Sequence, residues 1–424
     1  MRTASTGRAA PALVRRIGTA DAVVIGLGAM LGAGVFSAFG PAAAAAGTGL
    51  LLGLAIAAGL AYCNAVSSAQ LAAEYPASGG TYVYGCERLG HWWGFLAGWG
   101  FVVGKTASCA AMALTFAAYA IDGPEWAQRL VALAAVLVLT SVNLRGITRT
   151  AGLGRVLVAL TIAALALVVL AIVSSGELST SRLAGGLAGD GGVVGVLQAA
   201  ALLFFAFAGY ARIATLGEEV RDPARTIPRA IPLALGIVVV IYAVVAWCLV
   251  AILGADGVAV APAPLVAATD AAGAAWAAPV VRVGAAVASL GALLALVAGV
   301  GRTGLAMARN GDLPTWLAAV SPRFHVPHRA EVVVGAVVAV LVLTIDLKTV
   351  IGFSSFGVLL YYAVANAAAL TQTAEHRRWP RGLNVLGLVG CLVLVVALPL
   401  ASVGIGLAVF AVGAVGRAVA LARR

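Results

Sequence analysis

Ala29-Met30-Leu31-Gly32-Ala33-Gly34-Val35-Phe36 lies in the middle of an apolar segment, residues 19–47, that is long enough to cross a bilayer. Glycine in a helix interior costs about 1 kcal/mol relative to alanine, so Gly32 and Gly34 mark a place where the helix can be interrupted. The freed amides of Ala33, Gly34 and Val35 would start a second half-helix, whose positive end favours a carboxylate. The alternative is an uninterrupted helix whose small residues allow close packing.

The composition around this stretch is that of a membrane protein. Of the 424 residues, 62% are hydrophobic and 10% are charged, and the mean hydropathy is +1.05. Soluble domains carry roughly 25% charged residues. The net charge of +11 arises from Lys and Arg dispersed through short loops rather than gathered in one patch, so we expect a lipid bilayer and not a nucleic acid as the partner.

About twelve apolar segments are long enough to span a bilayer. Loops that we place in the cytoplasm carry most of the cations, and the outward loops carry mainly acids such as Asp122 and Glu125. Because cytoplasmic loops retain Lys and Arg, we expect both termini in the cytoplasm and the protein in the plasma membrane. The segments are 19–47, 50–73, 93–120, 128–144, 153–174, 193–217, 230–253, 275–301, 332–345, 349–370, 383–400 and 401–420.

A second interruption is expected in the sixth segment. Phe204-Phe205-Ala206-Phe207-Ala208-Gly209-Tyr210-Ala211 places a glycine and small residues near its midpoint. The first and sixth segments lie five spans apart, and an odd number of spans inverts the second copy of a repeat. Paired broken helices in antiparallel halves are typical of a substrate site at the membrane midplane.

Four motifs follow one another along the chain: Gly32-Ala33-Gly34-Val35-Phe36, Glu74-Tyr75-Pro76-Ala77-Ser78-Gly79-Gly80, Phe205-x-Phe207-x-Gly209 with Glu218-Glu219-Val220-Arg221-Asp222-Pro223, and Arg302 with Met307-Ala308-Arg309-Asn310-Gly311-Asp312-Leu313-Pro314. These motifs resemble the amino acid–polyamine–organocation (APC) superfamily of permeases, and the resemblance covers 19–400. It implies an all-α membrane protein with a 5+5 inverted repeat, broken first and sixth helices and two further C-terminal helices. The expected divisions are a cytoplasmic tail at 1–18, repeats at 19–174 and 193–370, and the last two spans with a tail at 383–424.

The same resemblance implies a substrate site made mainly of backbone groups. Amides of the first break would bind the substrate carboxylate, and the carbonyls of Met30, Phe205 and Ala208 would bind its amino group. Phe205 also matches an aromatic residue that closes over the substrate, although packing against Phe204 and Phe207 is the alternative. The expected substrate-binding residues are Met30, Gly32, Ala33, Gly34, Val35, Phe205, Ala208, Gly209 and Tyr210.

The sequence departs from the family pattern after Gly209. Several members carry an acidic residue where Ala211 stands, and Arg212 follows near mid-membrane. A buried arginine usually pairs or reaches water, so Arg212 either pairs across helices or with Glu218, or lines the cavity and disfavours cationic substrates. We therefore expect a small or neutral amino acid as substrate. An amine or polyamine permease of the same superfamily is the alternative, and a non-transporting membrane sensor is a further one.

Three polar residues inside the spans bear on which ion drives transport. Sodium-coupled relatives use hydroxyls of the eighth span, where Ser289 is the main candidate, and some proton-coupled relatives place a lysine where Thr161 stands here. Lys105 lies deep in the third span, and removal from water favours the neutral form of a lysine. We expect Lys105 to supply a fixed or titrating charge near the empty ion site, making transport proton-linked or ion-independent. A structural contact with backbone carbonyls is the alternative.

No enzymatic role is expected. The histidines fall in inner loops without ligand spacing, the five cysteines are scattered, and the sequence has no GxxxxGK[ST] element for nucleotide hydrolysis. We therefore assign no metal, no cofactor and no catalytic residue. The sequence predicts a secondary active transporter that works by alternating access.

Overall fold

The computed structural model describes residues 15–76, 79–146, 151–183 and 191–422. These residues form helices and connecting turns and contain no strand, apart from one isolated bridge between Ile17 and Val220. Ala77 and Ser78 of the second motif, and most of the expected N-terminal tail, lie outside the described residues. The helices are α1 (Thr19–Met30), α2 (Gly34–Ser37), α3 (Phe39–Ala46), α4 (Leu50–Glu74), α5 (Thr81–Leu89), α6 (His91–Ala120), α7 (Glu125–Leu144), α8 (Ala151–Ser174), α9 (Gly192–Phe207), α10 (Ala211–Ala214), α11 (Pro223–Val260), α12 (Pro264–Ala271), α13 (Ala278–Arg309), α14 (His328–Thr344), α15 (Leu347–Leu370), α16 (Arg381–Ala397) and α17 (Leu400–Ala422).

Ten helical stretches in the described part of the chain are long and apolar enough to cross a membrane. Two further helices, α14 and α16, have 17 residues each, which is the lower limit for a transmembrane helix. Together they account for the twelve expected segments. The protein is therefore an all-α membrane protein.

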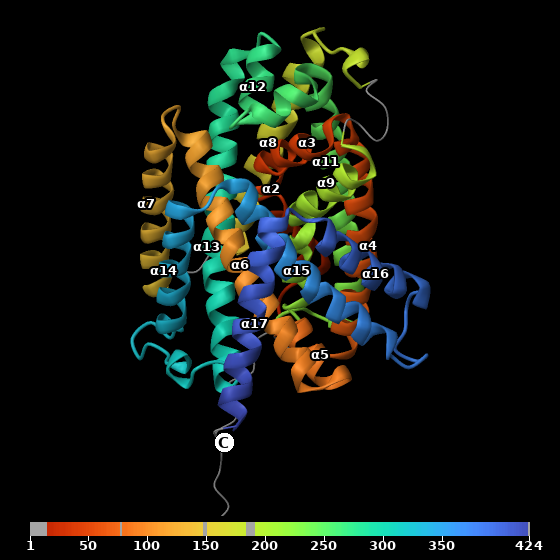
Figure 1. Ribbon diagram of the computed structural model, residues 1–424, viewed down its shortest axis with the longest axis vertical. Helices are drawn as coiled ribbons and strands as arrows, with labels where there is room; N and C mark the ends of the chain where they lie inside the picture. Colours follow the sequence, from red (N-terminus) through yellow and green to blue (C-terminus); the bar gives the residue numbers. More distant parts are fainter. Residues whose placement is uncertain (1–14, 77–78, 147–150, 184–190, 423–424) are drawn as a thin grey trace, which may run out of the picture.

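The long helices run side by side in one bundle (Figure 1). The short helix α5 lies at one end, together with the C-terminal end of α17, and α12 lies at the opposite end. We refer to these as the α5 end and the α12 end. The loop between α13 and α14 also lies at the α5 end.

Both expected interruptions are present. The helix α1 ends at Met30, and helical structure resumes at Gly34 in α2. Ala38 keeps helical backbone angles between α2 and α3, so residues 34–46 continue as a second half-helix. In the sixth segment, α9 ends at Phe207, a short 3₁₀-helix η3 (Ala208–Tyr210) follows, and α10 resumes at Ala211.

A buried polar cluster fixes α4, α15 and α16 to one another. The Asn366 amide donates to Asn64 Oδ1 at 2.6 Å, and the Ser67 hydroxyl donates to Asn366 Oδ1 at 2.6 Å. The Asn384 amide donates to Ser67 Oγ at 2.6 Å. All four side chains are fully buried, so water cannot reach their polar groups. The hydrogen bonds within the cluster take the place of hydrogen bonds to water.

We expect Asn366→Ala to lower the Tm of the purified protein in detergent by about 2–5 °C, because it leaves Asn64 and Ser67 without this partner in an apolar interior. Ser141→Ala is the matched control, since the Ser141 hydroxyl is exposed and donates to Leu137 of its own helix. A Tm for Asn366→Ala equal to that of the control would show that the cluster does not stabilise the bundle.

Candidate functional site

The two interruptions contact each other through their backbones. A Cβ atom placed on Gly209 would lie 2.4 Å from the carbonyl carbon and oxygen of Ala29, and one placed on Gly34 would lie 2.6 Å from Ala206 Cα. Real Cβ atoms do not approach other atoms so closely. Glycine is therefore required at both positions, because the two broken helices meet there. Helix interruption and close packing, the two alternatives left open by the sequence, occur together.

The half-helix that begins at Gly34 places unpaired amides at the first break. The first N–H groups of a helix have no acceptor within it, so those of Gly34 and Val35 are available where the chain turns at Gly32 and Ala33. Gly32 itself lies against α13, where its Cβ would meet the Ala292 methyl group at 2.8 Å. These four residues are buried together, and a carboxylate site at their amides remains a prediction.

The carbonyls of the breaks are occupied by side chains of other helices. The Tyr242 hydroxyl on α11 donates to Met30 O at 2.6 Å and lies 3.1 Å from Ala206 O. Lys105 Nζ on α6 donates to Ala208 O at 3.1 Å, and the Tyr362 hydroxyl on α15 lies 3.4 Å from the same oxygen. Two of the carbonyls expected to bind a substrate amino group, those of Met30 and Ala208, thus already accept hydrogen bonds from the protein.

Tyr242 was not anticipated as a site residue. The signal for it in the sequence is modest: one tyrosine in an otherwise aliphatic stretch of α11. Its ring is fully buried against Phe39 and Phe207, at centroid distances of 6.3 and 5.1 Å. A buried tyrosine hydroxyl needs a hydrogen-bond partner, and here it joins the first break to the second.

The aromatic residues of the second break are packed in the interior. Phe205 is 7% exposed, and its neighbours Phe204 and Phe207 are fully buried. The ring of Tyr210 lies 5.1 Å from that of Tyr362, between centroids, and the two rings are tilted by 32°. In this conformation Phe205 has the surroundings of a packed core residue, and a gating movement of its ring remains a prediction.

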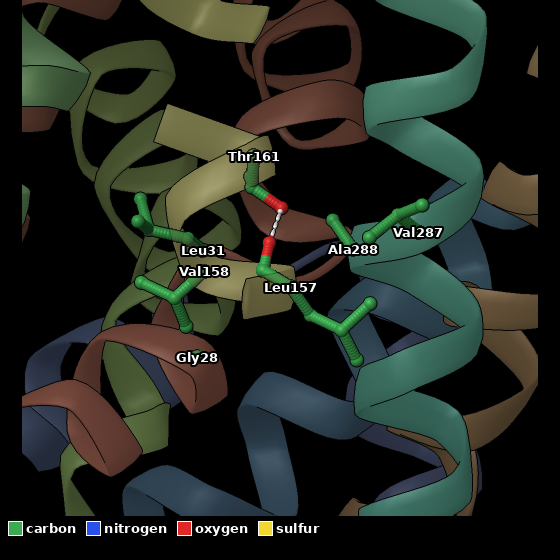
Figure 2. Close-up of a pocket in the computed structure, with 7 residues that line it drawn as sticks. All are labelled: Gly28, Leu31, Leu157, Val158, Thr161, Val287 and Ala288. Carbon is green, nitrogen blue, oxygen red and sulfur yellow. Dashed lines mark hydrogen bonds between the residues drawn. The ribbon is translucent and has the colours of Figure 1, made fainter. Parts of the chain in front are cut away.

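Thr161 lines a small cavity between α1, α8 and α13 (Figure 2). The cavity measures ≈ 10 Å³, about the space that one water molecule needs, and its Thr161 hydroxyl donates to Leu157 O at 2.9 Å. Ser289 is fully buried near this level but does not line the cavity, and its hydroxyl has no partner among the described residues. The residues that line the cavity are Gly28, Leu31, Leu157, Val158, Thr161, Val287 and Ala288.

Lys105 does not line this cavity, and a charge from Lys105 near the ion site remains a prediction. Its side chain is 7% exposed and extends from α6 to the carbonyl of Ala208. The positive charge therefore lies at the second break. Residues of the described chain form no ion pair with Lys105.

Arg212 is also without an ion pair among the described residues, so the pairing expected with Glu218 or another helix is not seen there. Its guanidinium lies 3.5 Å from the Thr215 hydroxyl, one turn further along the chain. The side chain is half-buried on the α5 side of the break. Among the described residues, no group of three His, Cys, Asp or Glu side chains is placed to hold a metal ion.

Comparison with known proteins adds the family. Residues 17–419 match the amino acid permease family. An uncharacterized transporter of Mycobacterium tuberculosis is 62% identical over 401 residues, which cover 95% of this chain and 90% of the relative. A branched-chain amino acid permease of Bacillus subtilis is 26% identical, covering 88% of this chain and 84% of the permease. A cationic amino acid transporter of Arabidopsis thaliana is 30% identical, covering 82% of this chain and 64% of that transporter.

The broken helices and the family match over nearly the whole chain both indicate a permease. Relatives in this family are transporters and not enzymes. The chain is a multi-pass membrane protein that belongs to the amino acid permease family of the APC superfamily.

Proposed function

We propose that this protein is a secondary transporter of small or neutral amino acids in the plasma membrane, driven by protons or working as an ion-independent exchanger. Segments 19–174 and 193–370 form the two inverted halves, and the α5 end, with both termini, faces the cytoplasm. Alternating access then proceeds by movement of the halves around the two breaks. The remaining segment, 383–424, supplies the last two helices.

The observation that carries this proposal is the hydrogen bond from Lys105 Nζ to Ala208 O. An ammonium group bound to a carbonyl at a helix break is the contact that an amino acid's own amino group would make. We infer that the substrate amine replaces the Lys105 ammonium at this oxygen, while the substrate carboxylate binds the amides of Ala33, Gly34 and Val35.

The charges around the breaks favour a neutral side chain. Helices α9 and α10 contain no Asp or Glu, and α1 carries only Asp21, which pairs with Arg155 at 2.5 Å near the α5 end. A lysine or arginine substrate would add a cation beside Lys105 and Arg212 without a carboxylate partner, and such repulsion excludes a ligand effectively. The branched-chain permease among the relatives is consistent with this choice, whereas the plant cationic transporter is the contrary example.

We expect purified protein in liposomes to exchange alanine, serine or leucine at least about tenfold faster than arginine or lysine. One unfavourable contact between the substrate cation and Lys105 or Arg212 is sufficient for a difference of this size. Counterflow of radiolabelled amino acids, with sodium replaced by choline, measures this directly. Faster exchange of arginine or lysine would overturn the neutral substrate class, and a strict requirement for sodium would overturn the coupling. Binding by thermal shift without counterflow would indicate a sensor.

A further inference from the structure

An apolar groove lies at the surface of the bundle, and no residue of the two breaks lines it. It has a volume of ≈ 410 Å³ and lies between α6, α13, α14, α15 and α17. Its floor is formed by interior residues such as Ala107 and Val350, which are 0% and 1% exposed. Its rim includes Val337 and Ile405, which are 44% and 39% exposed. The groove is therefore accessible sideways from the membrane.

One ridge of α14 follows the groove along its length. Val333, Val337 and Leu341 recur every four residues and line it, and Ile345, directly after the end of α14, lines it too. At 1.5 Å per residue, the helical part of this ridge, from Val333 to Leu341, extends over about 12 Å. One leaflet contributes about half of a hydrocarbon core that is roughly 30 Å thick, so this length fits an acyl chain within one leaflet.

The next position of the same ridge toward the α5 end carries a positive charge. Arg329 precedes Val333 by four residues and is exposed. Its guanidinium donates to the carbonyl of Trp316 at 3.2 Å, and the adjacent residue Leu317 lines the groove. Within the described residues Arg329 forms no ion pair, so its charge stands uncompensated where the groove meets the membrane surface.

We propose that this groove binds one acyl chain of an anionic phospholipid from the leaflet at the α5 end, with the lipid phosphate on Arg329. The apolar lining matches the chain, and the planar guanidinium matches a phosphate oxygen pair. The exposed Trp316 at the same level is typical of residues at headgroup depth. A second copy of the protein is the alternative occupant, which the oligomeric state of the variants below distinguishes from a lipid.

The site bears on the transport pathway through α6. Val102, Val103 and Thr106 line the groove on either side of Lys105, whose side chain extends in the other direction to Ala208. A lipid in the groove thus packs against the segment of α6 that positions Lys105. This consequence rests on the proposed function, whereas lipid binding itself does not.

The test is native mass spectrometry of the full chain, released from micelles containing palmitoyl-oleoyl phosphatidylglycerol or palmitoyl-oleoyl phosphatidylcholine. We expect the wild type to retain one phosphatidylglycerol in preference to phosphatidylcholine. Arg329→Gln should weaken phosphatidylglycerol retention about tenfold and abolish the preference, because a charge-assisted hydrogen bond is lost. Val337→Trp, which fills the groove, should reduce retention of both lipids.

Matched controls separate the groove from the general lipid-facing surface. Val340 lies on the same helix, is 60% exposed and does not line the groove, so Val340→Trp should retain lipid as the wild type does. Arg323→Gln removes an exposed cation elsewhere at the α5 end and should preserve the preference. Unchanged retention in both Arg329→Gln and Val337→Trp would overturn the proposal, as would loss of a dimer in Val337→Trp without any change in bound lipid. Arg329→Gln alters an exposed side chain, so it tests the site even if Val337→Trp fails to fold.

Discussion

Gly209→Val is expected to abolish amino acid exchange in liposomes, with a loss of about 100-fold or more. The Cβ position at Gly209 lies 2.4 Å from backbone atoms of Ala29, and backbone cannot move aside by changing a rotamer. The two broken helices would be forced apart, which displaces the carbonyls and amides that we propose as the substrate site. A displacement near 1 Å at a reacting or binding centre is sufficient for a 100-fold effect.

The control for this substitution is another glycine in a spanning helix. A Cβ on Gly236 of α11 would meet nothing within 4 Å, so Gly236→Ala should exchange amino acids at the wild-type rate. Gly209→Ala adds the smallest possible side chain and should fall between Gly209→Val and the wild type. Counterflow is measured only on protein that elutes as a single species from gel filtration. Exchange by Gly209→Val above half of the wild-type rate would contradict the direct backbone contact between the breaks.

The interruptions themselves could be predicted from sequence because their cause is local. Gly32 and Gly34 weaken one helix at its centre, and Gly209 weakens another, without reference to any distant residue. The number of spans likewise depends on hydropathy along the chain, which gave twelve segments with α14 and α16 at the lower length limit. The ends of the helices were less accurate: α11 starts at Pro223, seven residues before the expected segment.

The occupants of the break carbonyls could not be predicted in the same way. Tyr242 reaches Met30 O across 212 positions of sequence, and Lys105 reaches Ala208 O across 103. Such contacts depend on the rotation of α11 and α6 about their own axes, which a uniformly apolar sequence leaves undetermined. The depth of Lys105 was evident from its distance along α6, but the helix that it faces was not. For this reason the sequence does not predict the hydrogen bond from Lys105 to Ala208 at the second break.

The position of Lys105 leads to a prediction that separates a titrating charge from a fixed one. If the Lys105 ammonium competes with the substrate amine for Ala208 O, losing its proton weakens that competition. The KM for a neutral amino acid should then fall as the pH rises from 5.5 to 8.5 in the wild type. Lys105→Met removes the competitor, so its KM should not vary with pH. At pH 5.5 this KM should be about tenfold lower than that of the wild type, because one charge-assisted hydrogen bond accounts for a change of this size.

Lys105→Arg is the variant that decides the matter. Arginine keeps its charge throughout this pH range, so its KM should remain high at every pH if titration of Lys105 causes the wild-type dependence. Persistence of the wild-type pH profile in Lys105→Met would assign the profile to another group and leave Lys105 a structural role at Ala208. A structural role alone lowers the Tm of both variants without altering how KM varies with pH. The KM profile therefore tests whether the lysine at the second break takes the place of the substrate's own amino group.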